Sequence, residues 1–259
     1  MSASQIVRAC ARALVPVATG ALLLGAALAG AAPASAPPPA GFHVPAPART
    51  VLKNGLTVLV QENHGIPLVQ LRLMIKTGST ADPAGKEGTA ALLARLLKRG
   101  TKSRSASQFF EEVEFVGGTI DTNAGPDASF VWGEFAARDA EVGFNLLADL
   151  VLNPAFRAEE FDKEKRLALA DIVETLDDPE RLAQTSFASW LYAGHPYGRP
   201  VDGTERSVKA ITRDDVTALY EARYAPGNAV LAVVGDVSAA QAAQRADHYF
   251  AGWRRRAVP

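Results

Sequence analysis

Residues 51–60 read VLKNGLTVLV, and this stretch decides how the fold begins. Its Asn54-Gly55 pair is a tight-turn signal that lies between two short apolar runs, so the pattern predicts two antiparallel strands joined by a turn. Further along, residues 68–77 alternate between apolar and polar side chains and predict another strand. A loop rich in glycine, proline and charge is expected at residues 78–88.

Helical periodicity dominates after this loop, with one more pair of strands inside it and one late strand. Helices are expected at residues 89–98, 107–116, 139–151, 158–176, 179–191, 213–224 and 239–250. Strands are expected at residues 119–123, 128–136 and 229–234. Early strands followed by helices predict an α+β fold, in which one sheet is covered mainly on one face by helices.

The composition describes a globular protein without a strong electric field. Of the 259 residues, 48% are apolar and 21% are charged, which is enough apolar material for a substantial core. The 27 Lys and Arg residues nearly balance the 28 Asp and Glu residues. Long-range attraction to nucleic acid or to an anionic membrane surface is therefore excluded.

The N-terminal segment has the layout of a secretory signal peptide. Arg8 and Arg12 precede an Ala/Leu-rich run at residues 13–32, and small residues follow it. Ala34 and Ala36 fit an A-x-A cleavage site, which predicts a signal peptide over residues 1–36. Cleavage nearer residues 31–32 stays open, as does a permanent membrane anchor, because the run is just long enough to span a bilayer.

Cleavage of this signal has consequences for location and chemistry. The protein would be exported to the periplasm and have no membrane association afterwards. The single cysteine, Cys10, would be removed, which excludes disulfides, a cysteine nucleophile and thiolate metal ligands from the mature chain. A Pro/Ala-rich tether is expected at residues 37–49, followed by one domain over residues 50–259.

Seven short stretches along this domain resemble one known family. Their order and spacing are similar to those of the N-terminal domain of the pitrilysin/insulinase-type (M16) zinc peptidases, a family that includes the mitochondrial processing peptidase subunits. The resemblance implies a mixed, largely antiparallel sheet. It also implies a second homologous domain in complete members, which is expected to be absent here; a truncated reading frame, a fragment of a longer protein and a separately encoded half all stay open. The stretches are LKNGLTV (52–58), TGS through Gly88 (77–88), KRGT (98–101), DDP (177–179), HPYG (195–198), YAPGN (224–228) and VVGD (233–236).

In active members of that family, a helix after the glycine-rich loop carries the motif H-x-x-E-H. Its two histidines bind zinc, its glutamate polarises the attacking water, and a later helix supplies a carboxylate ligand. The flanking glycines of this chain place the three motif positions at Ala91, Ala94 and Arg95. The later carboxylate falls at Asp171, with Glu164 seven residues earlier on the same helical face.

These substitutions predict that the chain binds no zinc and needs no cofactor. Two methyl groups offer no lone pair, and Arg95 is a permanent cation that repels a divalent ion. We hypothesise that Arg95 takes the place of the metal and pairs with Asp171, and with Glu164 as a further candidate acid. The alternative is that Arg95 is a surface residue and the two acids are solvated.

The sequence favours structural roles for the other candidate residues. The histidines His43, His64, His195 and His248 are isolated in sequence, without the i, i+4 spacing of a zinc pair. Nucleophilic hydrolysis lacks a G-x-S-x-G motif. Residues 123–127 lie where relatives pair a strand edge with an extended peptide, so peptide binding without cleavage stays open.

The resemblance therefore favours a catalytically inactive M16 peptidase-like domain. The leading expectation is a non-catalytic subunit or half that helps an active M16-type zinc peptidase bind extended peptides. One alternative is a free-standing periplasmic module for peptide binding or assembly. Another is an active zinc metalloendopeptidase with an unorthodox site.

Overall fold

The computed structural model describes residues 45–258, without the side chain of Leu176. The predicted signal peptide, most of the predicted tether, Cys10 and His43 lie outside the described residues. In the described part, none of the helices combines the length and the apolar character needed to cross a bilayer.

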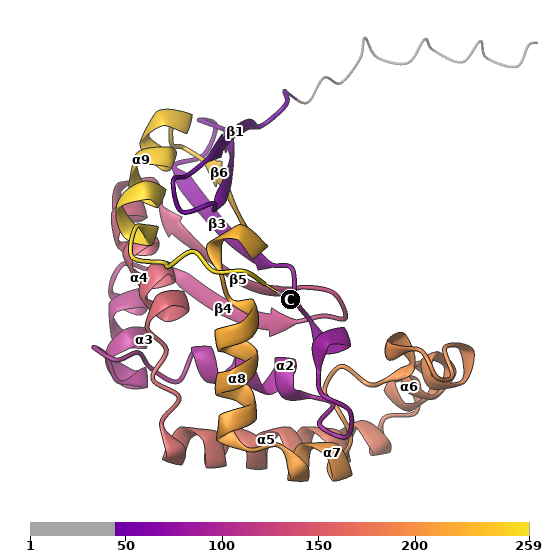
Figure 1. The fold of residues 1–259 in the computed structure, drawn as a ribbon. Coiled ribbons are helices and arrows are strands. Elements are labelled where there is room, and N and C mark those ends of the chain that lie inside the picture. The colour runs from indigo at the N-terminus through magenta and orange to yellow at the C-terminus, as the bar shows by residue number, and fades with distance from the viewer. Residues whose placement is uncertain (1–44, 259) are drawn as a thin grey trace, which may run out of the picture. The chain divides into compact units, whose positions relative to one another are not determined.

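One six-stranded sheet organises the domain (Figure 1). β2 and β6 run parallel, whereas every other neighbouring pair is antiparallel, which confirms the mixed, largely antiparallel sheet. The order across the sheet is β1 (Ala48–Val51), β2 (Thr57–Glu62), β6 (Ala229–Gly235), β3 (Leu68–Ile75), β5 (Ser129–Ala136) and β4 (Thr119–Ala124).

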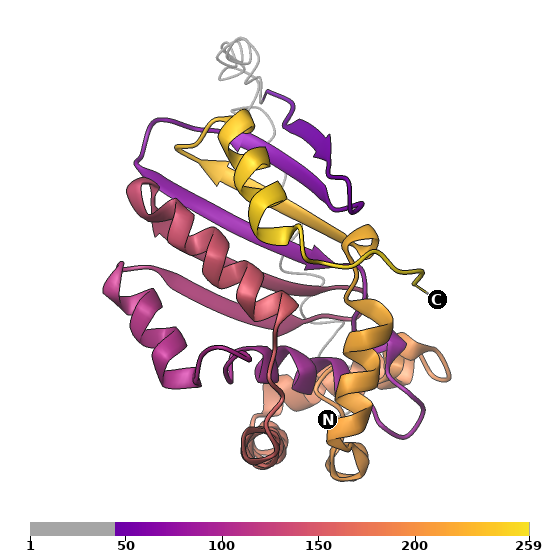
Figure 2. The ribbon, with the colours of Figure 1, turned by 60° about the vertical axis from the view of Figure 1, so that its left-hand side comes forward.

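Helices cover mainly one face of this sheet, as expected. Val69, Leu71 and Leu73 of β3 point into the core, while the residues between them face the other way. Figure 2 shows α4 (Ala140–Leu152) and α9 (Ala239–Phe250) lying across the buried face, with α3 (Ala106–Phe115) beside them. The opposite face carries Arg72, whose guanidinium lies 4.7 Å from the centre of the Phe130 ring.

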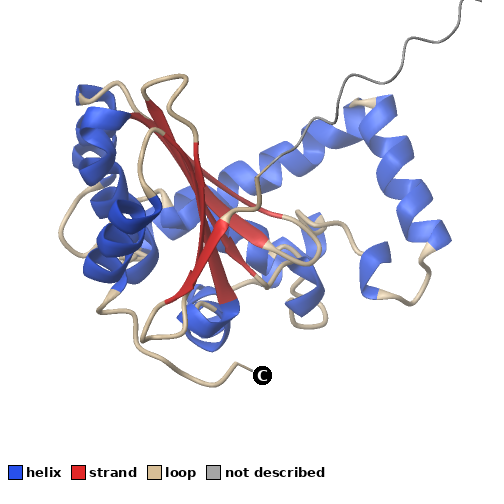
Figure 3. Cartoon of the chain, turned by 90° about the horizontal axis from the view of Figure 1, so that it is seen from above, coloured by secondary structure: helices blue, strands red, loops and turns tan. Residues whose placement is uncertain are grey.

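A second group of helices gathers at the β4 edge of the sheet. It contains α2 (Thr89–Leu97), α5 (Ala158–Asp177), α7 (Glu205–Ala210) and α8 (Arg213–Arg223). α2 packs against β4, α5 and α8, and every residue of this helix except Arg95 is buried. α6 (Pro179–Leu191) follows α5 and stands away from the strands (Figure 3).

Two features differ from the pattern expected from sequence. β1 begins at Ala48, inside the expected tether, because residues 48–51 pair with residues 57–60 of β2 although they show no apolar periodicity. α7 was not expected, because six residues with two buried side chains are too short to show a helical period. Its only signal is the capping box of Thr204 and Ser207.

Candidate functional site

The start of α2 is fixed by a buried carboxylate. The two oxygens of Asp82 accept hydrogen bonds from the backbone N–H groups of Gly88 and Ala90, each at 2.8 Å. Burial raises the pKa of Asp82 to about 6, against the effect of these hydrogen bonds. Gly88 has φ 99°, so the turn into the helix needs a residue without a side chain.

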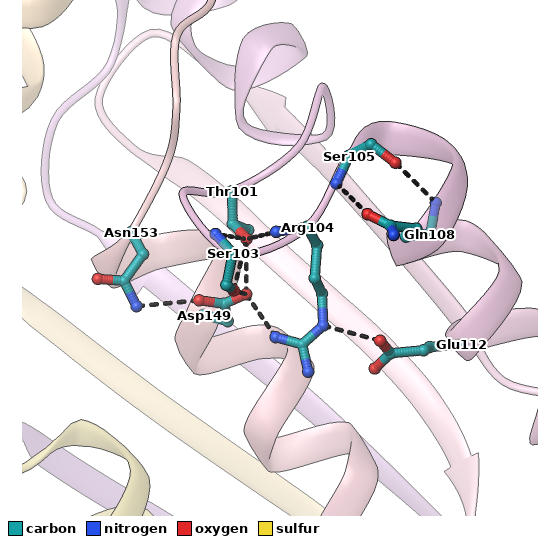
Figure 4. A network of polar contacts seen from close by, with 8 residues as sticks. All are labelled: Thr101, Ser103, Arg104, Ser105, Gln108, Glu112, Asp149 and Asn153. Atoms are coloured by element: carbon teal, nitrogen blue, oxygen red, sulfur yellow. Dashed lines mark hydrogen bonds and ion pairs between the residues drawn. The ribbon is translucent and has the colours of Figure 1, made fainter.

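The loop after α2 is held by a second buried carboxylate, Asp149 of α4 (Figure 4). It accepts hydrogen bonds from Thr101, from Arg104 and from Asn153, at 2.7, 2.7 and 2.9 Å. Burial raises the pKa of Asp149, but the hydrogen bonds from Thr101, Asn153 and Arg104 outweigh it, so the pKa is lowered overall. The loop after α2 is thereby anchored to the core.

The three motif positions lie together on one wall of a pocket of about 420 Å³. Ala91, Ala94 and Arg95 come from α2, and the remaining lining residues come chiefly from α5, the end of β4 and the residues just after α2. These are Lys98, Arg99, Asp121, Thr122, Asn123, Ala124, Glu164, Leu167, Asp171 and Asp202. The sequence-derived site residues thus share one pocket.

An ion pair joins Arg95 to Asp171. Nη2 of Arg95 lies 2.7 Å from Oδ2 of Asp171, and it bridges α2 and α5. The side chains are 31% and 48% exposed. Arg95 thus has an acidic partner, but both side chains stay partly exposed, so the pair contributes no more than about 1 kcal/mol to stability.

Glu164 does not join Arg95, contrary to one expectation from the sequence. It pairs with Arg99, whose Nε lies 2.5 Å from Oε1 of Glu164. The Glu164 side chain is only 3% exposed. Arg99 lies four residues after Arg95, and Glu164 lies seven residues before Asp171. Arg99 and Glu164 therefore form a second ion pair beside the Arg95–Asp171 pair. Sequence reasoning missed Arg99, although its spacing from Arg95 was a usable signal.

A third pair ties the end of α2 to the sheet edge. Lys98 forms an ion pair with Asp121 of β4. Burial raises the pKa of Asp121, but hydrogen bonds from Lys98 and from the Thr122 N–H outweigh it, so the pKa is lowered. The Thr122 hydroxyl donates to the carbonyl of Ala94 at 2.6 Å. Each of the three cations lining the pocket is thus paired with an acid.

The donor set does not fit zinc. Structural and catalytic zinc sites need three or four protein ligands, and the two alanines supply none. Asp171 and Glu164 are each bonded to a guanidinium. Between residues 45 and 258, no cluster of three or more His, Cys, Asp or Glu side chains is placed to hold a metal ion. Ala94 also lacks the carboxylate that would activate water.

The described histidines lie apart from this pocket. His64 contacts Asp236 at 2.7 Å and Glu62 at 3.4 Å, which raises its pKa through hydrogen bonds to these acids. His195 accepts from the N–H of Tyr197 at 3.2 Å. His248 lies outside the pocket, and its ring packs on that of Tyr249.

Several polar groups of residues 123–127 already accept hydrogen bonds from other parts of the chain. The carbonyls of Gly125 and Pro126 accept from the N–H groups of Ser79 and Thr80, each at 3.0 Å. Asp127 accepts from the hydroxyl of Tyr197 at 2.7 Å. The part of this segment that lines the pocket is limited to Asn123 and Ala124.

Sequence comparison assigns the family. The family model described as Insulinase (Peptidase family M16) matches residues 57–205, and the one described as Peptidase M16 inactive domain matches residues 210–259. The chain belongs to peptidase family M16. An uncharacterized zinc protease from Rickettsia felis is 28% identical over 204 residues, which are 79% of this chain and 50% of the relative. One from Mycobacterium leprae is 31% identical, over 73% of this chain and 42% of the relative.

Solved structures show the same fold. A peptidase M16 inactive domain from Pseudomonas fluorescens superposes with a TM-score of 0.77 at 26% identity, over 82% of this chain and 52% of that chain. The periplasmic protease PqqL from Escherichia coli superposes with a TM-score of 0.75 at 18% identity, over 82% of this chain and 24% of that chain, and shows the fold alone. The chain spans about half the length of the Rickettsia felis relative and of the Pseudomonas fluorescens structure.

Proposed function

We propose that this protein is a catalytically inactive M16 peptidase-like domain, exported to the periplasm, which helps an active zinc metallopeptidase partner bind peptide substrates. The observation that carries the proposal is the guanidinium of Arg95, bonded to Asp171 in a pocket that it shares with Ala91 and Ala94. These are the positions that hold the ligands and the general base in the family's motif. At these positions, the pocket has neither the histidine ligands nor the general base that the family's hydrolysis uses.

Two findings support a role beside another domain. The relatives are about twice as long as the matched region, so this fold is accompanied in them by a comparable length of chain. Residues 210–259 match the family model of an inactive domain, which is consistent with a non-catalytic part of an assembly.

The first experiment measures zinc and activity in the purified mature chain. We expect far less than one zinc per chain by atomic emission, and no cleavage of an unstructured fluorogenic peptide. A relative with an intact H-x-x-E-H motif, purified in the same buffers, controls for metal lost during preparation. Stoichiometric zinc together with cleavage that a chelator abolishes would restore the active metalloendopeptidase interpretation.

The second experiment searches for the partner. The tagged chain, produced in its native host, is expected to co-purify with an M16 protein that retains the zinc motif, identified by mass spectrometry. Recovery of the chain alone, as a stable monomer under gentle extraction, would count against the subunit role.

One observation favours a free-standing peptide-binding module as the second candidate. β4 is the last strand of the sheet, and its residues Asn123 and Ala124 line the pocket, so the end of this edge strand borders a cavity. Fluorescence anisotropy with labelled unfolded peptides separates the candidates. Tight binding by the monomer alone favours the module, whereas binding that requires the M16 partner favours the subunit.

A further inference from the structure

A second pocket lies between α5 and α6, and none of the three motif positions lines it. It has a volume of about 510 Å³ and is lined by α5, by the first half of α6 and by residues 200–205, which lead into α7. Figure 1 shows the chain leaving α5, turning through α6 and returning to α7. Small-molecule sites have volumes of about 300–1,000 Å³, so this pocket is large enough for a small ligand.

The wall formed by residues 200–205 is fixed against the turn before α2. Gly203 has φ 78°, and a Cβ atom there would lie 2.1 Å from the carbonyl oxygen of Glu87. The hydroxyl of Ser207 donates to the same carbonyl at 2.8 Å. The carbonyl oxygen of Asp202 lies 2.7 Å from where a Cβ atom of Gly88 would be. The backbone at Asp202 is therefore held in place by the rest of the domain.

The interior of the pocket is mainly apolar. Ile172 of α5, Leu182 of α6 and Val201 contribute branched side chains to it. Leu182 is 39% exposed, so an apolar group that packed on it would remove carbon surface from water. These side chains favour a ligand with an apolar body.

Two opposite charges, Arg181 and Asp202, line this pocket without pairing. Both also line a smaller pocket of about 270 Å³ that adjoins it. Over residues 45–258, neither side chain forms an ion pair or a hydrogen bond, with the other or with any third residue. Glu205, the remaining charged residue of the larger pocket, pairs with Lys209. Glu174 also lacks a partner among the described residues, but it lines the smaller pocket alone.

We propose that the pocket between α5 and α6 binds a short apolar zwitterion, either a free amino acid or a dipeptide. The Arg181 guanidinium binds the carboxylate of the ligand, and the Asp202 carboxylate binds its ammonium group. Ile172, Leu182 and Val201 contact its apolar body. A ligand with one charge would leave either Arg181 or Asp202 without a partner. The inference is independent of the proposed function, because the motif positions take no part in it.

Isothermal titration calorimetry of the purified mature chain tests the ligand class, with leucine and leucyl-leucine as probes. We expect one saturable site for at least one of them, and the tighter ligand shows which length the pocket takes. N-acetyl-leucine lacks the ammonium group and leucinamide lacks the carboxylate, so each should bind at least about tenfold more weakly than leucine. Absence of saturable binding for both zwitterions, or equal affinity for the capped ligands, would overturn the inference.

Two variants assign the charges to the groups of the ligand. Arg181→Gln should weaken binding of the zwitterion at least about tenfold but leave the affinity for leucinamide unchanged, because leucinamide has no carboxylate. Asp202→Asn should weaken the zwitterion equally and leave the affinity for N-acetyl-leucine unchanged.

Glu174→Gln is the matched control, since it removes an exposed, unpaired charge beside the pocket, and it should bind the zwitterion as the wild type does. All three side chains are exposed, so the melting temperature should stay the same in each variant. Undiminished binding in Arg181→Gln or Asp202→Asn, or an equal loss in Glu174→Gln, would show that these two charges do not hold the ligand.

Discussion

Arg95 and Arg99 are four residues apart and both pair with acids of α5, yet their surroundings differ. The partner of Arg95 is 48% exposed, whereas the partner of Arg99, Glu164, is 3% exposed. Water can solvate Asp171 if its arginine is removed, whereas the Glu164 side chain is largely shielded from water. The free-energy cost of losing each guanidinium should therefore differ.

Arg99→Met is expected to lower the free energy of unfolding by about 3 kcal/mol, because it leaves a buried charge without a partner. Arg95→Met should cost no more than about 1 kcal/mol. Urea denaturation of both variants measures the difference. The double variant Arg99→Met, Glu164→Leu should recover most of the loss, and equal costs for the two single variants would contradict the assignment.

Asp82 should make the domain more stable as the pH falls from about 6 to about 4. Its pKa is raised to about 6 in the native state, so over this range the native chain binds a proton that the unfolded chain does not. Relative to Asp82→Asn, which cannot titrate, the wild type should gain about 2 kcal/mol of unfolding free energy between pH 7 and pH 4. A flat difference across this range would show that Asp82 keeps an ordinary pKa.

Asp149 should act with the opposite sign. Its pKa is lowered, so its stabilisation is present above the ordinary value of about 3.9 and is lost as the pH falls below it. Asp149→Asn is expected to cost about 2 kcal/mol at pH 7, since it weakens the bonds from Thr101 and Arg104. Acid titration of both proteins, followed by circular dichroism, should show the two stabilities converging below about pH 4.

At the scale of elements, α2 and α5 place Arg95, a predicted motif position, opposite Asp171, the predicted remnant carboxylate. Arg95 already reaches Asp171 from the helix opposite. Restoring Ala91→His, Ala94→Glu, Arg95→His and Asp171→Glu is therefore expected to create binding of one zinc per chain, measured by atomic emission after dialysis. The same variant without Ala91→His is the control and should bind much more weakly. A folded variant that binds no zinc would show that the helices are misaligned for metal.

The sequence predicts most elements of this fold, and the reasons for the exceptions are physical. Long amphipathic segments such as α4 and α5 show their period directly, and the flanks Gly88 and Gly100 place the motif positions on α2. α7 is too short for a period. The pairing of Glu164 depends on how two helices slide against each other, which no local pattern encodes.

The candidate site was accessible from sequence only in part. The residues at the predicted motif positions 91, 94 and 95 can be read without a structure, because the prediction uses only residue identity and the flanking glycines. The occupation of the Gly125 and Pro126 carbonyls by residues 79–80 was not visible, since it arises from a contact between distant loops. The sequence predicts a helix at residues 179–191, but only the packing around α6 shows that none of its residues is buried.

At the scale of the whole molecule, stability should be independent of chelators. The links between α2 and α5 are ion pairs of the chain itself. We expect the melting temperature of the mature chain to shift by less than about 1 °C in excess EDTA, measured by differential scanning calorimetry. The melting temperature of a zinc-bearing relative should fall in the same buffer. A clear loss of stability in EDTA would reveal a metal that contributes to the fold.

The Arg95–Asp171 pair also has a consequence for how the protein is made. A zinc link must be delivered after synthesis, and its formation depends on how much free metal the compartment contains. A link between two side chains is encoded in the gene and is complete once the chain folds. Where zinc is scarce, a zinc-dependent relative would be left without its metal, whereas the link between α2 and α5 in this domain would still form.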